Sequence, residues 1–227
     1  MKKVFVSITT TRGSDWRKQI REIKKRGLEE AALFLTCLEK EGRKKLYGFL
    51  EKNKISNIPF VHIRNDMAPR ELDYLIKNFK TEKFNIHTGR EFPLICDYPR
   101  HRKKIFIENI YLPLDEEEVK SFAGICLDLA HLENDRVFEF KKFKHNLNIL
   151  EKYPIGCNHI SCFQETVHKD DRGHIRRDRH FMSNISELNY LKKYPKRYFS
   201  DTIALELEND IETQLKARDC LLEIIRE

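Results

Sequence analysis

The 227-residue chain contains only eight glycines, and it lacks a G-x-G-x-x-G motif. Open doubly wound sheets usually carry that glycine-rich phosphate turn after an early strand, so its absence disfavours a dinucleotide-binding fold. Long apolar runs are also missing, because the longest, from Ala31 to Leu38, contains Thr36 and Cys37. A helix across a membrane needs about 18 apolar residues. The sequence therefore excludes a membrane-spanning helix.

No Cys-x-x-Cys pair occurs, and the six cysteines are scattered along the chain. This pattern indicates reduced, buried thiols rather than a disulfide framework. Two lysines near the start precede an apolar stretch that is too short for a secretory signal, so we expect a cytoplasmic protein. Linkers rich in proline and serine are missing too, which favours a single domain over residues 1–227.

The charge balance is basic, since 43 lysines and arginines outnumber 36 acids and give a net charge of +7. An anionic partner is consistent with this charge, and so is a basic surface that contacts only water. A hydrophobic content of 40% is that of a globular protein. The composition identifies neither the partner nor the oligomeric state.

Eight short apolar runs alternate with segments of helical periodicity. The predicted strands are residues 4–8, 31–35, 58–63, 84–87, 105–108, 125–129, 155–160 and 203–207. Helices are expected to begin near Ser14, Pro69 and Asp115, where capping residues or first-turn acids stand. Apolar stripes indicate two further helices over residues 140–150 and 211–225.

Strands that are apolar throughout and separated by helices are typical of parallel sheets covered on both faces. Eight such units predict an α/β fold, a single compact (β/α)8 TIM barrel with short βα loops. An open doubly wound sheet is the main alternative. The chain is small for a barrel of about 250 residues. Its weakest unit is residues 88–104, where two prolines and a basic cluster leave little room for a helix.

Acids and histidines lie at or just beyond the carboxyl ends of the predicted strands. They are His62, His87, Glu108, Asp128, His131, His159, Asp178, His180 and Glu206. A barrel brings the carboxyl ends of its strands to one mouth, so we expect these side chains to share one site. Each alone is a weak signal, because a single histidine in a strand is more often a hydrogen-bonded core residue. Together they predict two or three divalent ions, with zinc, manganese or iron suited to the ligands.

The polar stretch between the seventh and eighth strands also carries arginines that would stand at the mouth. They are Arg172, Arg176, Arg177 and Arg179. Guanidinium groups bind phosphate well, so these residues are candidates for holding an anionic substrate. A solvated loop explains them equally well. The same stretch contains Asp171 and His174, which are alternatives to Asp178 and His180 as ligands.

These features resemble the xylose isomerase-like barrel superfamily, and within it the endonuclease IV type of apurinic/apyrimidinic endonuclease. The resemblance covers nearly the whole chain. It rests on Val61-His62, Asn85-Ile86-His87, Ile107-Glu108-Asn109, Leu127-Asp128-Leu129-Ala130-His131, His159, Asp178-Arg179-His180 and Leu205-Glu206. It implies a multinuclear zinc site, with manganese or another divalent metal as alternatives.

The resemblance also assigns roles to the ligands. One ion would be held by His62 and His87, with Glu108 bridging to a second ion. The ligands of the second ion would be completed by Asp128, His159 and Glu206. A third ion would be bound by His131, Asp178 and His180. The implied activity is metal-assisted hydrolysis of a phosphodiester, with abasic sites in DNA as the substrate of that family. Glu206 and Glu108 are then the catalytic residues, and Glu206 orients or deprotonates the attacking water.

Two departures from endonuclease IV concern DNA. Asn65 stands where that family has an intruding tyrosine, and Arg43 is only a loose counterpart of its intruding arginine. A small phosphodiester, a nucleotide or a modified peptide is therefore also a candidate substrate.

The alternative function is that of a sugar or sugar-phosphate isomerase or epimerase of the same superfamily. One divalent ion would then be held by Glu108, Asp128, His159 and Glu206. The two glutamates would act as opposed acid and base at a carbon beside a carbonyl. Short loops agree with this alternative, whereas the pair His62 and His87 favours the hydrolase.

Overall fold

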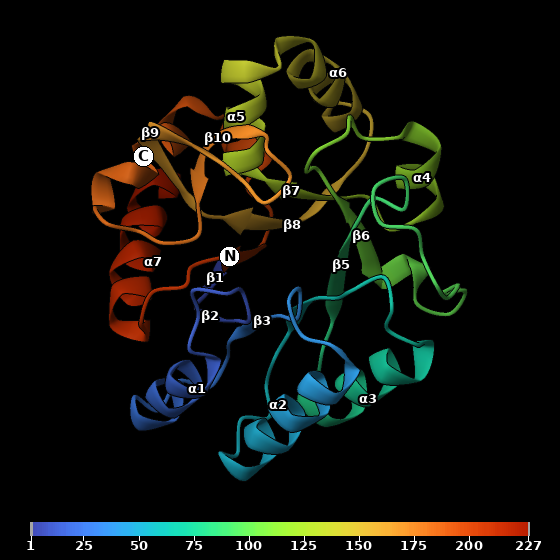
Figure 1. Ribbon diagram of the computed structural model, residues 1–227, viewed down its shortest axis with the longest axis vertical. Coiled ribbons are helices and arrows are strands. Elements are labelled where there is room, and N and C mark those ends of the chain that lie inside the picture. The colour runs from blue at the N-terminus through green and yellow to red at the C-terminus, as the bar shows by residue number, and fades with distance from the viewer. Residues whose placement is uncertain (1, 227) are drawn as a thin grey trace.

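A closed ring of parallel strands forms the centre of the computed structural model, which describes residues 2–226 (Figure 1). β1 (Lys3–Phe5) and β2 (Ser7–Thr9) are two halves of one strand, and they close the ring because β1 pairs with β11 while β2 pairs with β3. The other barrel strands are β3 (Ala32–Phe34), β4 (Phe60–His62), β5 (Lys83–His87), β6 (Ile105–Glu108), β7 (Ile125–Asp128), β8 (Ile155–Ile160) and β11 (Thr202–Leu205). The predicted (β/α)8 barrel is thereby confirmed, and each of the eight predicted runs overlaps a strand of the ring.

Helices surround this ring (Figure 1). They are α1 (Trp16–Lys25), α2 (Lys40–Lys52), α3 (Pro69–Phe79), α4 (Glu116–Ser121), α5 (Leu129–Phe138), α6 (Phe140–Leu150) and α7 (Ile211–Arg226). Short 3-10 segments are η1 (Arg102–Lys104), η2 (Ile185–Lys193) and η3 (Lys196–Tyr198). The main apolar core lies between the helices and the outer face of the strands.

The helix starts follow from capping chemistry. Pro69 occupies the first turn of α3, and the Asp115 side chain accepts a hydrogen bond from the backbone of Glu118 at the start of α4, as the sequence predicted. At α1 the cap is Asp15 rather than Ser14. The Ser14 hydroxyl is engaged elsewhere, since it lies within hydrogen-bonding distance of the hydroxyls of two nearby threonines.

The unit between β5 and β6 lacks an α-helix, as predicted for residues 88–104, and contains only η1. Glu118 of α4 holds this loop, because its carboxylate accepts a hydrogen bond of 2.6 Å from the Gly89 backbone and another from the Thr88 hydroxyl. A side chain from the next unit thus orders the loop that follows His87.

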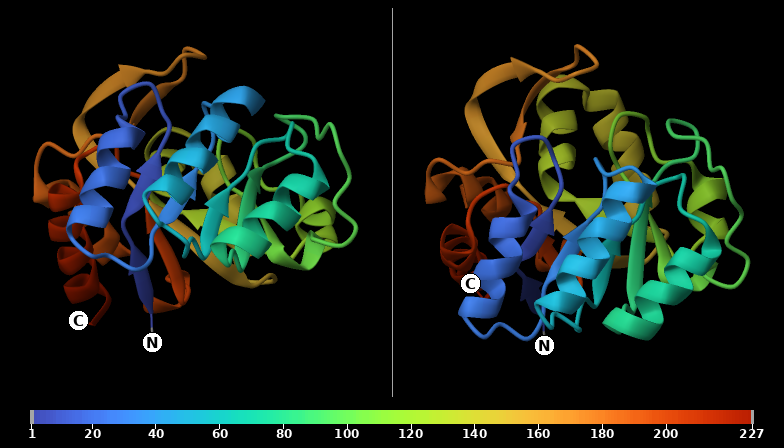
Figure 2. Two further views of the ribbon diagram at one scale, coloured as in Figure 1. Left: turned by 90° about the horizontal axis from the view of Figure 1, so that it is seen from below. Right: turned by 60° about the horizontal axis from the view of Figure 1, so that its bottom comes forward.

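The stretch after β8 forms a β-hairpin that the sequence analysis described only as a polar segment. β9 (Cys162–Lys169) pairs antiparallel with β10 (Ile175–Arg179), and Gly173 takes a φ of +85° in the turn. The hairpin stands at the end of the barrel opposite the chain's N-terminus, where the strands have their carboxyl ends (Figure 2). It therefore lies over the barrel mouth.

The interior of the barrel has a floor of apolar side chains. Its members are Phe5, Ala32, Phe34, Phe60, Phe106, Cys126, Cys157 and Ala204. Side chains in a strand alternate in direction, so the residue two positions later also points inward, one layer closer to the mouth. This alternation sets the position of the site. Separately, no helix within residues 2–226 is long and apolar enough to cross a membrane.

Candidate metal centre

Polar side chains form a layer directly above the floor of the barrel. His62, Glu108, Asp128, His159 and Glu206 each follow a floor residue by two positions. These five side chains are almost completely buried, with exposures between 0% and 4%. Because side chains alternate in direction along a strand, this spacing of two residues on five different strands brings five potential ligands to one level inside the ring.

The potential ligands form two groups that share one carboxylate. The first is His62, His87 and Glu108, and the second is Glu108, Asp128, His159 and Glu206. Within each group the ligand atoms lie within 4.8 Å of one another. The structure therefore brings six of the nine predicted ligands together in two adjoining sets.

The distances inside these groups suit a shared ion better than hydrogen bonds. Glu108 Oε2 lies 3.6 Å from His62 Nε2 and 3.8 Å from His87 Nε2. His159 Nδ1 lies 3.4 Å from Glu108 Oε1 and 3.5 Å from an oxygen of Glu206. Hydrogen bonds of this kind measure about 2.7–3.2 Å. Two ligands of one zinc ion, each about 2.0–2.2 Å from it, are separated by such longer distances.

Buried polar atoms without partners provide the test of whether a cation fits. Both ring nitrogens of His62, both ring nitrogens of His159 and Oδ2 of Asp128 are buried and have no hydrogen-bond partner among the described residues. Burying such groups without a partner is costly. Imidazole and carboxylate donors are the ligands that zinc and manganese accept. The donor set therefore fits divalent cations.

Burial shifts the pKa values of these groups toward their neutral forms. It raises the pKa of Glu108 to about 8 and also raises the pKa of Glu206. It lowers the pKa of His87 to about 3 and that of His159 to about 4. Desolvation is the largest cause in each case, because a buried charge loses its water. A cation in this layer would restore the ionised carboxylates.

Neighbouring side chains hold the ligands in place. The amide of Asn85 donates to Glu108 Oε2 at 2.6 Å, and the side chain of Asn109 accepts from the Asp128 backbone at 2.9 Å. Asp128 also caps α5, because its Oδ1 accepts from the His131 backbone at 2.7 Å. Its second oxygen is then left for an ion. Asn85 was not among the predicted site residues, although its position two residues before His87 places it on the same face of β5.

Cys126 lies beneath these ligands and forms a third compact group with Glu108 and His159. It stands two residues before Asp128 and was not predicted as a neighbour of the site. Burial raises the pKa of the Cys126 thiol well above its usual value. Because Cys126 packs with the apolar residues of the floor, we assign it to the floor.

The predicted ligands of a third ion, His131, Asp178 and His180, do not form a compact group among residues 2–226. Asp178 instead receives Arg176, whose Nε lies 2.9 Å from Oδ1 and whose Nη2 lies 2.7 Å from Oδ2. His131 Nδ1 lies 3.0 Å from Asp178 Oδ2. The nearest acid to His180 is Glu206, at 3.8 Å. The Arg176 guanidinium is thus bound to the Asp178 carboxylate, which was predicted as a ligand of the third ion.

The alternative ligands Asp171 and His174 lie in the exposed turn of the hairpin, outside all of the compact groups. Asp171 pairs with Arg12 at 3.2 Å, and the His174 ring stacks on Tyr111 with centroids 4.8 Å apart. Arg12 follows β2, whereas Tyr111 follows β6 on another side of the ring. The hairpin turn therefore spans the mouth.

The arginines of the hairpin differ in their surroundings. The Arg172 guanidinium lies against the rings of Phe92 and Tyr111, at 4.4 and 4.7 Å from their centroids. Arg177 donates to the backbone oxygen of Gln164 at 2.6 Å. Nε of Arg179 is buried without a hydrogen-bond partner. Substrate binding by these residues stays a prediction, and Arg172 is the one exposed at the mouth.

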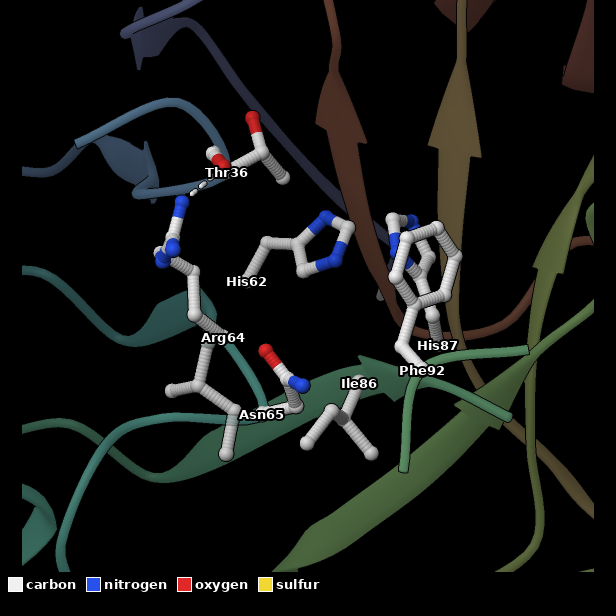
Figure 3. Close-up of a pocket in the computed structure, with 8 residues that line it drawn as sticks. Thr36, His62, Arg64, Asn65, Ile86, His87 and Phe92 are labelled. Atoms are coloured by element: carbon white, nitrogen blue, oxygen red, sulfur yellow. Dashed lines mark hydrogen bonds between the residues drawn. The ribbon is translucent and has the colours of Figure 1, made fainter. Parts of the chain in front are cut away.

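A cavity of about 120 Å³ opens beside the first ligand group (Figure 3). It is lined by Thr36, His62, Ile63, Arg64, Asn65, Ile86, His87 and Phe92. Arg64 is held at its edge by a 2.9 Å hydrogen bond from Nη1 to the backbone oxygen of Thr36. The cavity gives a small molecule a route to the imidazoles of the first group.

No protein-family model matches the sequence, and no curated protein matches it either. Solved structures do resemble the fold. A xylose isomerase-like TIM barrel protein from Mycobacterium smegmatis, in complex with magnesium, is 12% identical with a TM-score of 0.51, over 99% of this chain and 97% of that one. A putative xylose isomerase from Rhodospirillum rubrum is 13% identical with a TM-score of 0.50, over 100% and 97%. At this identity the likeness establishes the fold alone, which is a TIM barrel.

Proposed function

We propose that the protein is a metal-dependent hydrolase of phosphodiesters with a centre for at least two divalent ions, zinc being the first candidate. The observation that carries this proposal is the sharing of Glu108 between two ligand groups. A carboxylate that bridges two ions is the arrangement expected of a two-metal hydrolase. When bound, the ions would supply Lewis-acid stabilisation of charge on the phosphoryl oxygens.

The side chains of this protein would position the reaction and move protons. Glu206 lies at the inner end of the mouth with 4% exposure, and burial raises its pKa, so its carboxylate is a suitable acceptor for the proton of an attacking water. Asn85 fixes the orientation of Glu108 by its 2.6 Å hydrogen bond. Arg172 at the mouth would attract the anionic group of the substrate.

The structure favours a compact substrate over a DNA duplex. Arg43, the loose counterpart of a DNA-intruding arginine, is 1% exposed and pairs with Glu71 at 2.7 Å. The hairpin turn also contacts loops on two sides of the mouth through Asp171 and Arg172. A small phosphodiester can use the cavity beside His87, whereas a duplex would need the hairpin to move. Abasic DNA therefore comes second among the candidate substrates.

Metal analysis and activity in the same preparation test this proposal. We expect two or more zinc-type ions per chain in protein purified without chelator, together with hydrolysis of bis(4-nitrophenyl) phosphate. A duplex with one abasic site is the parallel substrate. Glu206→Gln should lower kcat at least a hundredfold, because it removes the proton acceptor. The matched control is Glu208→Gln, two residues later and outside the ligand groups. Equal loss in both variants would contradict the role of Glu206.

A metal-dependent sugar isomerase or epimerase is the second candidate. It is favoured by Glu108 and Glu206, which lie in one ligand group with Asp128 and His159, and by the fold shared with proteins described as xylose isomerase-like. One bound ion, no phosphodiesterase activity and proton exchange at a sugar carbon would support it over the hydrolase.

A further inference from the structure

A buried ion pair lies at the edge of the metal centre. Arg176 and Asp178 are each 6% exposed, and both belong to β10. The guanidinium contacts both carboxylate oxygens, through Nε to Oδ1 at 2.9 Å and through Nη2 to Oδ2 at 2.7 Å. Such a bidentate contact is among the strongest that a carboxylate makes. Asp178 is therefore fully engaged.

The same guanidinium also reaches His131. Nη2 of Arg176 lies 2.5 Å from His131 Nδ1, and Asp178 Oδ2 lies 3.0 Å from the same nitrogen. A nitrogen of neutral imidazole either donates or accepts a hydrogen bond. If Nδ1 accepts from Arg176, its lone pair is used. If Nδ1 donates to Asp178, it has no lone pair to offer. In either tautomer this nitrogen is closed to a metal ion.

His131 and Asp178 would otherwise form an ion site. Both are buried ligand types, and His131 Nδ1 lies 3.0 Å from Asp178 Oδ2. The other ring nitrogen, Nε2, faces the second ligand group, at 3.8 Å from Asp128 Oδ2 and 3.9 Å from Glu108 Oε1. Removal of Arg176 would leave a carboxylate and an imidazole facing an open position beside the two ligand groups. The guanidinium keeps its charge at every accessible pH, so this position always holds a cation.

We propose that Arg176 is a resident cation of the metal centre, which takes the place of a divalent ion between His131 and Asp178. This inference builds on the proposed function, because it presupposes ions in the two groups that share Glu108. The charges agree with it. The carboxylates of Glu108, Asp128, Asp178 and Glu206 offset two divalent ions, so the guanidinium leaves one positive charge in the centre. A phosphodiester carries one negative charge, which complements it.

Metal counting by mass spectrometry on folded, unchelated protein tests the inference. Arg176→Met should bind one ion per chain more than the parent protein, because it removes the guanidinium from Asp178 and His131. Arg176→Lys keeps a cation and should retain the parent count. Arg177→Met is the matched control, since Arg177 is the next residue of β10 and donates to Gln164 rather than to Asp178. It should also retain the parent count.

Further variants locate the additional ion. Combining Arg176→Met with Asp178→Asn should return the count to that of the parent, because the freed ligand is lost. Arg176→Gln, which keeps an amide donor near Asp178, serves if Arg176→Met does not fold, and it should also gain one ion. An unchanged count in folded Arg176→Met and Arg176→Gln would overturn the inference. The count in the parent protein tests the proposed function separately, since only the difference between variant and parent concerns Arg176.

Discussion

At the scale of single residues, Glu108 has the most connections in the centre. It belongs to all three compact groups, and its two oxygens face different imidazoles. His87 belongs to one group only. Substitution of these two residues should therefore change the number of bound ions unequally, although both belong to the ligand group that contains His62.

The first prediction compares Glu108→Gln with His87→Asn. Glu108→Gln should remove both ions, because the bridging charge is lost from both groups, while the amide of Asn85 keeps an oxygen to contact. His87→Asn should remove one ion and leave the group containing His159 intact. Metal content after dialysis and the unfolding midpoint are the measurements. Loss of the same number of ions in both variants would contradict the shared role of Glu108.

The positions of the clustered side chains could be predicted because residue type and strand position coincide. His87 and Glu108 end predicted strands and His62 is the last residue but one of another, so the fold and the cluster followed from one pattern. The fate of Asp178 could not be predicted. Arg176 stands two residues before it on the same face of β10, but sequence position alone does not show that this arginine pairs with the carboxylate.

At the scale of secondary-structure elements, the barrel floor requires a glycine in β8. A Cβ added to Gly156 would lie 1.9 Å from the ring of Phe106. Gly48 in α2 is the opposite case, because nothing lies within 4 Å of an added Cβ. These two glycines form a natural pair of test positions.

The second prediction concerns the free energy of unfolding of two alanine variants. Gly156→Ala should destabilise the protein by at least about 1–3 kcal/mol, because the overpacked floor must shift the Phe106 ring. Gly48→Ala should stabilise it by about 0.5–1 kcal/mol, because alanine is the better helix former. Urea unfolding monitored by circular dichroism measures both. A neutral Gly156→Ala would show that the floor tolerates an extra methyl group.

The hairpin is the element that the sequence did not reveal. Its strand β9 is exposed at half of its residues and contains mainly polar side chains, so it lacks the apolar period by which the barrel strands were recognised. The turn around Gly173 also lacks the Asn-Gly or Asp-Gly signal of a tight hairpin. The hairpin is ordered by the pairing of β9 with β10 and by the contacts of its turn with Arg12 and Tyr111. The last two contacts join segments far apart in the chain, so the local sequence does not predict them.

At the scale of the whole molecule, the free energy of unfolding without added metal depends on pH through the buried acids and histidines of the centre. The pKa of Glu108 is raised from 4.5 to about 8, so the folded state binds more protons than the unfolded state between these values. The contribution of Glu108 to the free energy of unfolding therefore falls as pH rises from 4.5 to 8. The pKa of His159 is lowered to about 4, so its contribution is lost as pH falls from 6.5 to 4.

The third prediction follows from competition between protons and ions for these ligands. The increase in unfolding midpoint on adding zinc should be larger at pH 8 than at pH 5.5, because at the lower pH Glu108 holds its proton more firmly. Differential scanning calorimetry with and without zinc at each pH isolates this effect from other titrating groups. In Glu108→Gln zinc should not raise the unfolding midpoint at either pH, because this variant is expected to hold neither ion. An increase that is greatest at pH 5.5 would contradict the prediction.

Closure of the ring also determines when the protein can finish folding. Lys3 pairs with Thr202, and the backbone N–H of Ser7 donates a hydrogen bond to the side chain of Gln214 in α7. A chain that leaves the ribosome from its N-terminus must therefore keep its first strand half paired until β11 and α7 have been synthesised. Contacts of such long sequence separation form slowly, because the entropy of closing the loop is lost before the contact is gained. We expect barrel closure to be the late, rate-limiting event, with the exposed edge of β1 open to wrong partners until it occurs.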